Sequence, residues 1–427
     1  MVGSYWVETL GCAKNQVDSD KLSGVLQADR YVAAADASEA DLVVVNTCAF
    51  VEAARQESIE SILYLAGRRR PGARLVVTGC MAERYGPELA DALPEVDLVA
   101  GFGVALAPAP APVAVELGRR PPAGFASFDL LNLPRPPAAA PWAYVKVAEG
   151  CDRRCGFCAI PSFRGRQRSR LAADVLAEVE ALGTAEVVLV AQDLASYGRD
   201  IGQPGAIVDL VGEVARRCQR TRLLYLYPSD LSAELIGAIG ATGCPYFDLS
   251  LQHVSRPLLR RMRRWGDGRR FAERIARIRG EHPDAALRSS FIVGYPGETE
   301  EDHDHLLGFL AEVELDWAGF FAFCPEEGTH AAGLPDHVPP DLARERLGEC
   351  GELQDRITAG RRQDLIGRQI TVLVDSAGVA RSHREAPEID GLVLVPDDLA
   401  VGTFNDVTVV GAEGPDLEAV AVPAGVR

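Results

Sequence analysis

The stretch WAYVKVAEGCDRRCGFCAIP, residues 142–161, decides how the central part of the chain folds. Its first seven residues form an apolar run that is typical of a buried strand. Cys151, Cys155 and Cys158, here called the central trio, follow on a strand-end loop where three thiolates can converge on one soft metal centre. Structural zinc takes four protein ligands, and no nearby Cys or His supplies a fourth. An iron–sulfur cube held by three cysteines leaves one iron open. The alternatives are a disulfide oxidoreductase loop and cysteines that serve only as buried packing residues.

Five more apolar runs follow the first, at intervals that leave room for a helix between successive runs. The intervening segments carry apolar residues at helical spacing, for example Val175, Val179 and Leu182. Strands that alternate with helices predict an α/β fold with a parallel sheet, and six such units indicate an incomplete (βα)6 barrel. An open doubly wound sheet has the same periodicity and is the alternative. The six expected strands span residues 142–148, 185–191, 221–227, 246–252, 287–294 and 317–324.

A similar alternation precedes this region, with apolar runs at residues 5–10, 41–46 and 74–79 that are each followed by a helix-like stretch. It predicts an N-terminal α/β domain built on a parallel sheet. One cysteine lies at or just beyond the C-terminal end of each predicted strand, at the edge where the loops of a parallel sheet meet. Unrelated packing cysteines are the plainer interpretation, but the repeated placement favours a shared site. This N-terminal trio comprises Cys12, Cys48 and Cys80.

Changes in composition mark the domain boundaries. Residues 105–136 are rich in Ala and Pro, which is typical of an extended linker between an N-terminal domain at 1–104 and a core at 137–366. Residues 367–427 contain short apolar runs with turn residues and no helical spacers. This last pattern predicts a small antiparallel β-barrel.

The composition of the chain limits its location and its partners. Its 427 residues are 47% hydrophobic, and no apolar run approaches the roughly 20 residues of a membrane helix. The opening segment MVGSYWVETLGCAKN lacks the pattern of a signal or transit peptide, so we expect a cytoplasmic protein whose thiols are reduced. The formal net charge of −17 disfavours nucleic-acid binding unless basic side chains are gathered in one place.

The spacing Cys-x3-Cys-x2-Cys, with Phe157 directly before the last cysteine, resembles the signature of radical S-adenosylmethionine enzymes. The segments ETLGCAKNQ, NTCAFVEAARQ and TGCMAERY resemble the cluster domain of the methylthiotransferases in that superfamily, and the C-terminal module resembles a TRAM domain. The resemblance implies two [4Fe-4S] clusters, one on the N-terminal trio and one on the central trio. It also implies that S-adenosylmethionine binds the open iron of the second cluster and yields a 5′-deoxyadenosyl radical on one-electron reduction.

Several segments resemble the methylthiotransferase branch that acts on an aspartate of small-subunit ribosomal protein twelve. The resemblance implies that a methylthio group is inserted at the β-carbon of that aspartate, with the basic ribosomal protein as partner. It also implies an electron donor such as flavodoxin or ferredoxin, and it leaves the source of the sulfur open. The segments are residues 148–170, 190–200, 227–231, 251–264 and 381–393.

Two other functions fit parts of the sequence. A transfer-RNA adenosine methylthiotransferase would use the same chemistry and bind RNA in a salt-dependent way. A non-catalytic iron–sulfur protein that binds RNA or senses oxygen would form no 5′-deoxyadenosine. Residues 364–427 carry eleven Asp and Glu against four Arg, and this balance of −7 argues against RNA binding by the TRAM-like module and suits a basic protein target.

Polar residues and glycines after the predicted core strands are candidates for contact with S-adenosylmethionine, because ligands gather at the carboxyl ends of parallel strands. A tight turn before a helix capped by Thr299 would explain the two glycines equally well. His253, between two of these strand ends, is expected to be a structural hydrogen-bonding residue. The candidates are Gln192, Asp193, Gln252, Gly294 and Gly297, together with Phe157, which directly precedes the last cysteine of the central trio.

Arginines are dense around the central trio, and their guanidinium groups would hold the carboxylate of a substrate aspartate or would serve only solubility. Arg154 and Arg164 are the candidates for substrate contact. The run from Arg260 to Arg264 falls in a helical pattern and is expected to be a solvated face. The other cysteines are expected to be packing residues, and they are Cys218, Cys244, Cys324 and Cys350.

Overall fold

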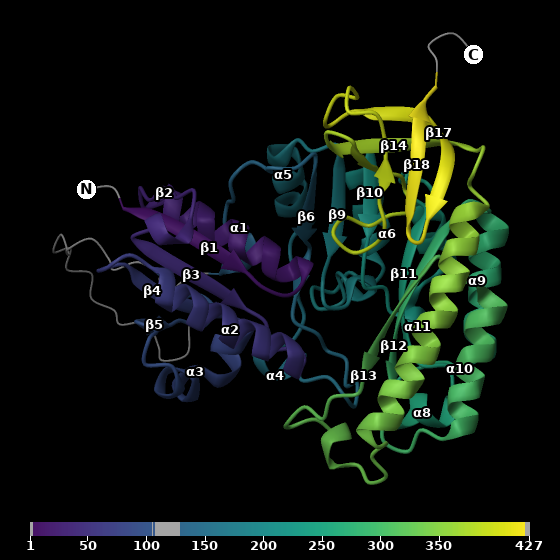
Figure 1. The fold of residues 1–427 in the computed structure, drawn as a ribbon, viewed down its shortest axis with the longest axis horizontal. Helices are drawn as coiled ribbons and strands as arrows, with labels where there is room; N and C mark the ends of the chain where they lie inside the picture. The colour runs from purple at the N-terminus through teal and green to yellow at the C-terminus, as the bar shows by residue number, and fades with distance from the viewer. Residues whose placement is uncertain (1–2, 105, 107–128, 423–427) are drawn as a thin grey trace. The chain divides into compact units, whose positions relative to one another are not determined.

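The computed structural model describes residues 3–104, 106 and 129–422, which form two compact units (Figure 1). The first unit contains the chain up to Pro137 together with Ala159–Arg166, and the second contains Ala138–Cys158 and the chain from Gln167 onward. The sequence places Ala159–Arg166 inside the core at 137–366, whereas the structure packs this segment with the first unit. Most of the predicted linker, residues 105 and 107–128, lies outside the described residues.

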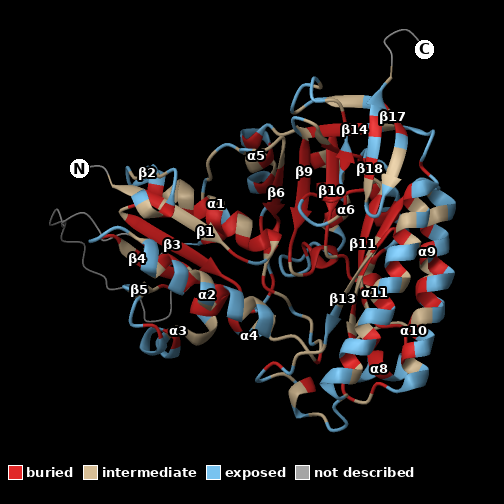
Figure 2. Cartoon of the chain, viewed as in Figure 1, coloured by how far each residue is buried: buried red, intermediate tan, exposed pale blue. Residues whose placement is uncertain are grey.

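The first unit is built on a five-stranded parallel sheet in the order β2-β1-β3-β4-β5. The three predicted strands are confirmed as β1 (Ser4–Thr9), β3 (Leu42–Thr47) and β4 (Arg74–Gly79), and two-residue strands extend both edges. β3 is buried along its whole length (Figure 2), as expected of a parallel strand covered on both faces. The edge strands are β2 (Val32–Ala33) and β5 (Leu98–Val99), and the helices are α1 (Ala13–Ala28), α2 (Glu52–Arg68) and α3 (Cys80–Ala92).

Alternate residues of β3 pack into two separate hydrophobic clusters, because successive side chains of a strand point to opposite faces. Val43 and Val45 join side chains of α2 and α3, whereas Leu42 and Val44 join side chains of α1. The short helix α4 (Ile160–Arg164) adds Phe163 to the cluster on the α2 and α3 face. This packing explains why α4 belongs to the first unit.

The second unit contains the incomplete barrel that the sequence predicts. All six predicted strands are present, although the third, expected at residues 221–227, ends at Leu223. One parallel sheet has the order β10-β9-β6 and another has the order β11-β12-β13, and a parallel bridge between Leu226 and Leu249 joins them. Within the described residues, no pairing connects β6 to β13, so the barrel stays open. The strands are β6 (Trp142–Lys146), β9 (Glu186–Val190), β10 (Arg220–Leu223), β11 (Tyr246–Gln252), β12 (Ala286–Val293) and β13 (Trp317–Ala322).

Helices cover the outer face of this barrel. Val187 and Leu189 of β9 pack in one cluster with apolar residues of α5 and α6, so the alternate residue Glu186 faces the interior. Of the helices in the described ranges, none has both the length and the hydropathy to cross a membrane. The helices are α5 (Ala172–Leu182), α6 (Ala206–Ala215), α7 (Ala233–Gly240), α8 (Arg256–Arg261), α9 (Gly268–Glu281), α10 (Glu300–Val313) and α11 (Pro340–Gln363), and a hairpin pairs β7 (Ala148–Glu149) with β8 (Arg168–Ser169).

The C-terminal module is a closed five-stranded barrel in the order β14-β15-β16-β18-β17. It confirms the predicted small β-barrel and differs from a purely antiparallel one, because β16 and β18 pair in parallel. The connection from β16 to β17 places β17 beyond β18 in the barrel. β18 then pairs antiparallel with β17 and parallel with β16. The strands are β14 (Gln369–Ser376), β15 (Val379–Arg381), β16 (Val393–Leu394), β17 (Phe404–Glu413) and β18 (Asp416–Ala421).

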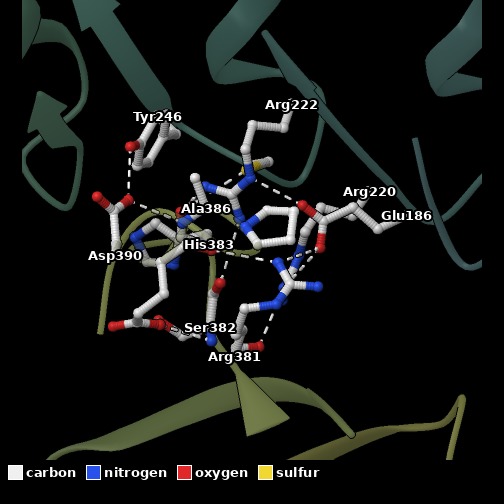
Figure 3. Close-up of polar contacts among 12 residues, drawn as sticks. Glu186, Arg220, Arg222, Tyr246, Arg381, Ser382, His383, Ala386 and Asp390 are labelled. Atoms are coloured by element: carbon white, nitrogen blue, oxygen red, sulfur yellow. Dashed lines mark hydrogen bonds and ion pairs between the residues drawn. The ribbon is translucent and has the colours of Figure 1, made fainter. Parts of the chain in front are cut away.

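The segment Arg381–Asp390 of this module attaches it to the amino ends of the large barrel's strands (Figure 3). Arg381 Nη1 pairs with Glu186, the first residue of β9, at 3.1 Å. Arg222 donates from Nη1 to the His383 carbonyl at 2.9 Å, and the Tyr246 hydroxyl donates to Asp390 at 2.6 Å. The module is therefore held at the end of the barrel opposite to the strand ends that precede the central trio.

Candidate functional site

The N-terminal trio lies at the carboxyl ends of three neighbouring strands. Cys12 follows β1 and is the N-cap residue of α1, Cys48 follows β3, and Cys80 follows β4 as the first residue of α3. The thiols are near enough to influence one another electrostatically. Helix N-termini favour negative charge, which offsets part of the cost that burial imposes on the thiolates of Cys12 and Cys80.

A buried amide connects the three loops that carry these cysteines. Asn15 Nδ2 donates to the carbonyl of Leu10 at 2.8 Å and to the carbonyl of Thr47 at 3.0 Å, just beyond β1 and at the end of β3. The thiol of Cys80 lies 3.5 Å from Asn15 Oδ1. Asn15 thus fixes the spacing of the loops after β1, β3 and β4.

Two glycines allow the same loops to approach closely. Gly11 has a φ of +94°, and a Cβ on it would lie 2.7 Å from Cβ and 2.9 Å from Sγ of Cys48. Gly79 has a φ of +92°, and a Cβ on it would lie 2.3 Å from Oδ1 of Asn46. Any other residue would therefore be strained in its backbone and would displace the neighbouring loop.

The three thiols differ in how readily they ionise. Burial opposes ionisation of Cys12, but the charges of Lys14 and Arg164, together with backbone hydrogen bonds from Asn15 and Lys14, lower the pKa of this thiol below its ordinary value. Burial raises the pKa of Cys48 to about 11. Burial also raises the pKa of Cys80, although the charge of Arg164 opposes the rise. Arg164 is the cation common to all three thiols.

Arg164, the last residue of α4, reaches into this site. Its Nη2 donates to Cys80 Sγ at 2.9 Å and to Asn15 Oδ1 at 2.7 Å. Its Nη1 pairs with Asp18 at 2.9 Å, and both charged side chains are 3% exposed. The contact of Arg164 with substrate stays a prediction, whereas its contact with the surroundings of the N-terminal trio is a feature of the structure.

The central trio occupies the loop after β7 in the second unit. The backbone N–H of Arg153 donates to Cys151 Sγ at 3.4 Å, and Arg264 Nη1 donates to Cys155 Sγ at 3.3 Å. Gly156 donates to the carbonyl of Met262 and its own carbonyl accepts from Ala331, both at 2.8 Å, so the loop is fixed from two sides. Burial raises the pKa of Cys151 to about 11.

The polar residues after β9 lie at the same end of the barrel. Asp193 accepts from Arg153 Nε at 2.6 Å, and Arg153 also pairs with Asp230. Gln192 donates to Glu149 at 2.6 Å. The predicted cofactor contact Asp193 is therefore held by Arg153, on the loop of the central trio. Gln192 is held by Glu149 of β7, the strand that leads into this loop.

The remaining candidates lie at the ends of β11 and β12 or beside the trio. Gln252 ends β11 with a φ of +72°. Gly294 and Gly297 both have positive φ, and the Gly294 N–H donates to Glu298 at 2.7 Å, so they form the tight turn that precedes α10 and its capping residue Thr299. Phe157 is half-buried against the barrel's hydrophobic cluster and Arg154 is exposed. Their contacts with cofactor or substrate stay predictions.

Sequence reasoning missed several residues that contact the site. The expectation of a solvated face is wrong for Arg264, which is half-buried, donates to Cys155 and lies 4.3 Å from the ring centroid of Tyr227. Asn15 and Asp230 lie in segments that carry the family resemblance, but the sequence does not indicate their contacts with Cys80 and Arg153, which are distant in the chain. Glu149 had one available signal, its position two residues before Cys151.

The chemistry of both trios fits an iron–sulfur cluster, since each trio offers three thiols on loops fixed by hydrogen bonds. Within the described ranges, no three His, Cys, Asp or Glu side chains are grouped closely enough for a single metal ion. A cube presents its irons at separate corners, so its thiols stand further apart than the ligands of one ion. The assignment of the six cysteines as ligands stays a prediction.

Three family models match consecutive parts of the chain. The family described as "Uncharacterized protein family UPF0004" matches residues 4–101, the radical SAM superfamily matches residues 145–310, and the TRAM domain matches residues 366–422. Together with the sheet topology, these matches confirm the predicted fold class of a parallel α/β domain, a radical SAM barrel and a TRAM barrel.

Curated relatives match almost the whole chain, and they are named ribosomal protein uS12 methylthiotransferase RimO. The protein of Streptomyces coelicolor is 42% identical, with 96% of this chain and 95% of the relative covered. The protein of Desulforudis audaxviator is 41% identical with the same coverage, and that of Chloroflexus aurantiacus is 40% identical over 97% of this chain and 98% of the relative. A solved radical S-adenosylmethionine methyltransferase, TsrM from Kitasatospora setae, is 15% identical over 94% of this chain and 84% of its own, with a TM-score of 0.48. The expected methylthiotransferase branch is confirmed, and the chain belongs to the RimO family of radical SAM methylthiotransferases.

Proposed function

We propose that this protein inserts a methylthio group at the β-carbon of an aspartate in ribosomal protein uS12, the small-subunit protein twelve. The observation that carries the proposal is that a single chain of the RimO family contains two cysteine trios, one at the carboxyl ends of three parallel strands and one on the loop that follows the parallel strand β6 and the short strand β7. Such strand ends are where parallel folds bind their ligands.

The N-terminal trio would hold one [4Fe-4S] cluster, and the central trio would hold the other together with S-adenosylmethionine. S-adenosylmethionine bound at such a cluster supplies, on one-electron reduction, a carbon radical that removes hydrogen from an unactivated carbon, which no acidic or basic side chain can do. The electron would come from a donor such as flavodoxin or ferredoxin.

The protein's own residues would position the reactants and exclude water. The predicted cofactor contacts lie at the ends of β9, β11 and β12, and the pairing of Asp193 with Arg153 keeps its carboxylate oriented beside the central trio. Lys146 and Gln192 both donate to Glu149, which fixes that carboxylate at the mouth of the barrel. The exposed guanidinium of Arg154 would form forked hydrogen bonds with the carboxylate of the target aspartate.

Charge and family together favour a protein substrate over transfer RNA. The chain has a net charge of −17, and its last 64 residues are acidic, which repels phosphate and attracts a basic ribosomal protein. The names of the relatives point the same way. Modification of a ribosomal protein is consistent with the expected cytoplasmic location.

Mass spectrometry of uS12 from cells with and without this gene tests the substrate. We expect a methylthio addition on one aspartate only when the gene is present, and its loss when Cys151, Cys155 and Cys158 are changed to alanine. The matched control is Cys218→Ala, which removes a thiol that bonds only to the barrel's own backbone and to Thr221 among its described contacts, and it should leave the modification intact. An identical uS12 mass in both strains would contradict the proposal.

Anaerobic assays of purified protein separate the alternatives. Reduced, cluster-loaded protein should form 5′-deoxyadenosine with S-adenosylmethionine and a uS12 substrate, whereas a non-catalytic iron–sulfur protein would form none. Changing Cys12, Cys48 and Cys80 to alanine should abolish methylthiolation of uS12. Methylthio-adenosine in transfer RNA, with uS12 unmodified, would instead establish the transfer-RNA activity.

A further inference from the structure

The guanidinium of Arg164 is the feature of the N-terminal site that the cysteines alone do not explain. It donates to the sulfur of Cys80 at 2.9 Å, a charged donor on a thiol that lies at the end of β4. The side chain is 3% exposed, so this contact is shielded from water. An N–H···S bond in such surroundings is stronger than the same bond at a surface.

The neighbours of Arg164 hold the guanidinium in one orientation. Nη2 also donates to Asn15, the amide that connects the loops of the trio, and Nη1 pairs with Asp18. The guanidinium also lies 4.5 Å from the ring centroid of Phe102. Two nitrogens of the guanidinium bond to three acceptors, and one of its faces lies on a ring. The N–H that donates to Cys80 therefore has little freedom to change its orientation. A lysine ammonium has no planar fork and cannot reproduce these contacts together.

The positive and the negative charge of the Arg164–Asp18 pair are placed differently with respect to the sulfur of Cys80. Arg164 contacts Cys80 directly, whereas Asp18 contacts the guanidinium. A cluster bound by thiolates gains negative charge on reduction, and hydrogen bonds to its sulfurs stabilise the more negative state. The donor on Cys80 is therefore placed to favour the reduced cluster, and Asp18 to oppose it.

We propose that Arg164 is a positioning residue for Cys80 that raises the reduction potential of the cluster on the N-terminal trio, and that Asp18 tempers this effect. The proposal rests on the proposed function insofar as the trio must hold a cluster. It assigns a role to a residue outside both cysteine motifs, on the segment Ala159–Arg166 that packs with the first unit.

The test uses the full chain with Cys151, Cys155 and Cys158 changed to alanine, so that only the N-terminal cluster is present. Iron and sulfide are measured per chain, and the cluster is titrated anaerobically with dithionite and redox mediators while its electron paramagnetic resonance signal is followed. At a fixed poise, Arg164→Met should lower the ratio of reduced to oxidised cluster about tenfold, which corresponds to about 59 mV for one electron. Arg164→Lys, which retains the charge, should give a smaller decrease.

Two further variants separate tuning from structural support. Asp18→Asn keeps an acceptor for Arg164 but removes the negative charge, so it should raise the same ratio. If Arg164 and Asp18 had only a structural role, Arg164→Met and Asp18→Asn would not shift the ratio of reduced to oxidised cluster in opposite directions. Arg69→Met is the matched control, because Arg69 pairs with Asp97 on the surface of the same unit, and it should leave the potential unchanged.

Each result decides the proposal. Parent-like potentials in Arg164→Met and Asp18→Asn would overturn it while leaving the cluster assignment intact. If Arg164→Met loses its iron, the opposite shifts of Arg164→Lys and Asp18→Asn support the proposal and their absence overturns it. A parent without iron at the N-terminal trio would contradict the proposed function itself, and this proposal with it.

Discussion

At the scale of single residues, close approach between loops decides whether the N-terminal trio can converge. Gly11 directly precedes Cys12 and lies against the side chain of Cys48, with a φ of +94° that other residues rarely adopt. The absence of a side chain at position 11 is thus what lets the loop after β1 reach the loop after β3. The glycine is as much a requirement of the site as the thiols are.

Gly11→Ala should disrupt the N-terminal site, because the new Cβ would lie 2.7 Å from Cβ of Cys48 in a strained backbone. We expect loss of roughly half the iron per chain, and a decrease of about 1–3 kcal/mol in the free energy of unfolding. Iron analysis after anaerobic reconstitution and thermal unfolding measure these effects. Gly67→Ala in α2 is the control, since a Cβ there meets nothing within 4 Å and should be neutral or stabilising. Equal iron content in the two variants would contradict this account of Gly11.

At the scale of elements, local patterns predicted the strands that are long and apolar, and they failed where structure depends on distant contacts. The runs at 142–148 and 246–252 became β6 and β11, because their apolar content and spacing are local properties. The two-residue strands β2 and β5 carry no periodicity and exist only by pairing with β1 and β4.

The candidate site, like the strands, could be predicted only where it depends on local sequence. The positions of the six cysteines follow from their place after strands, which a sequence displays. The orientation of an arginine does not, because a long side chain is directed by whatever acceptors the fold brings near it. Arg264, in a helical pattern, turns to Cys155, and Arg164, expected near substrate, lies on Cys80. Both contacts connect residues more than 80 positions apart in the chain.

The segment Arg381–Asp390 depends on a buried carboxylate that belongs to the large barrel. Glu186 is buried and pairs with Arg222 at 2.8 Å, Arg381 at 3.1 Å and Arg220 at 3.6 Å (Figure 3). Glu186→Gln would remove the buried anion that these guanidinium groups share, although Arg381 would keep its pair with Asp375, and should lower the free energy of unfolding by about 3–5 kcal/mol. Urea unfolding of the full chain measures the change. Glu180→Gln, which breaks an exposed pair with Arg217, should lower the free energy of unfolding far less, and equal losses would contradict the assigned role of Glu186.

Asp390 gives the same segment a pH dependence. Burial raises the pKa of its carboxyl from an ordinary 3.8 to about 6, although Arg288 opposes the rise. The folded chain therefore binds this proton more tightly than the unfolded chain, so stability should fall as pH rises from about 4 to about 6 and then level off. Two pH units correspond to at most about 3 kcal/mol. Asp390→Asn keeps an acceptor for Tyr246 and should lack this fall, so parallel pH profiles of the urea midpoint in the two proteins would exclude the effect.

At the scale of the whole molecule, net charge separates the two candidate substrates. Acidic residues exceed basic ones by 17, and several exposed acidic residues lie on the C-terminal barrel, among them Asp397, Asp398 and Glu418. A TRAM barrel with this charge repels phosphate. The barrel is also fixed to the large barrel through buried ion pairs, so its acidic surface is a permanent part of the second unit.

The full chain should therefore bind uS12 in a salt-dependent way and bind transfer RNA weakly at any salt concentration. Raising salt from about 50 mM to about 200 mM shortens the screening length, so the association rate with a basic protein should fall several-fold while the dissociation rate changes little. Kinetic binding measurements on immobilised uS12 and on transfer RNA, at both salt concentrations, test this expectation. Asp397→Asn combined with Asp398→Asn should slow association with uS12 further, whereas Asp174→Asn combined with Asp209→Asn, on α5 and α6 of the large barrel, serves as a charge-matched control away from the C-terminal barrel. Tight binding of transfer RNA with a steep loss at higher salt would show that local basic side chains outweigh the net charge, and would favour the RNA substrate.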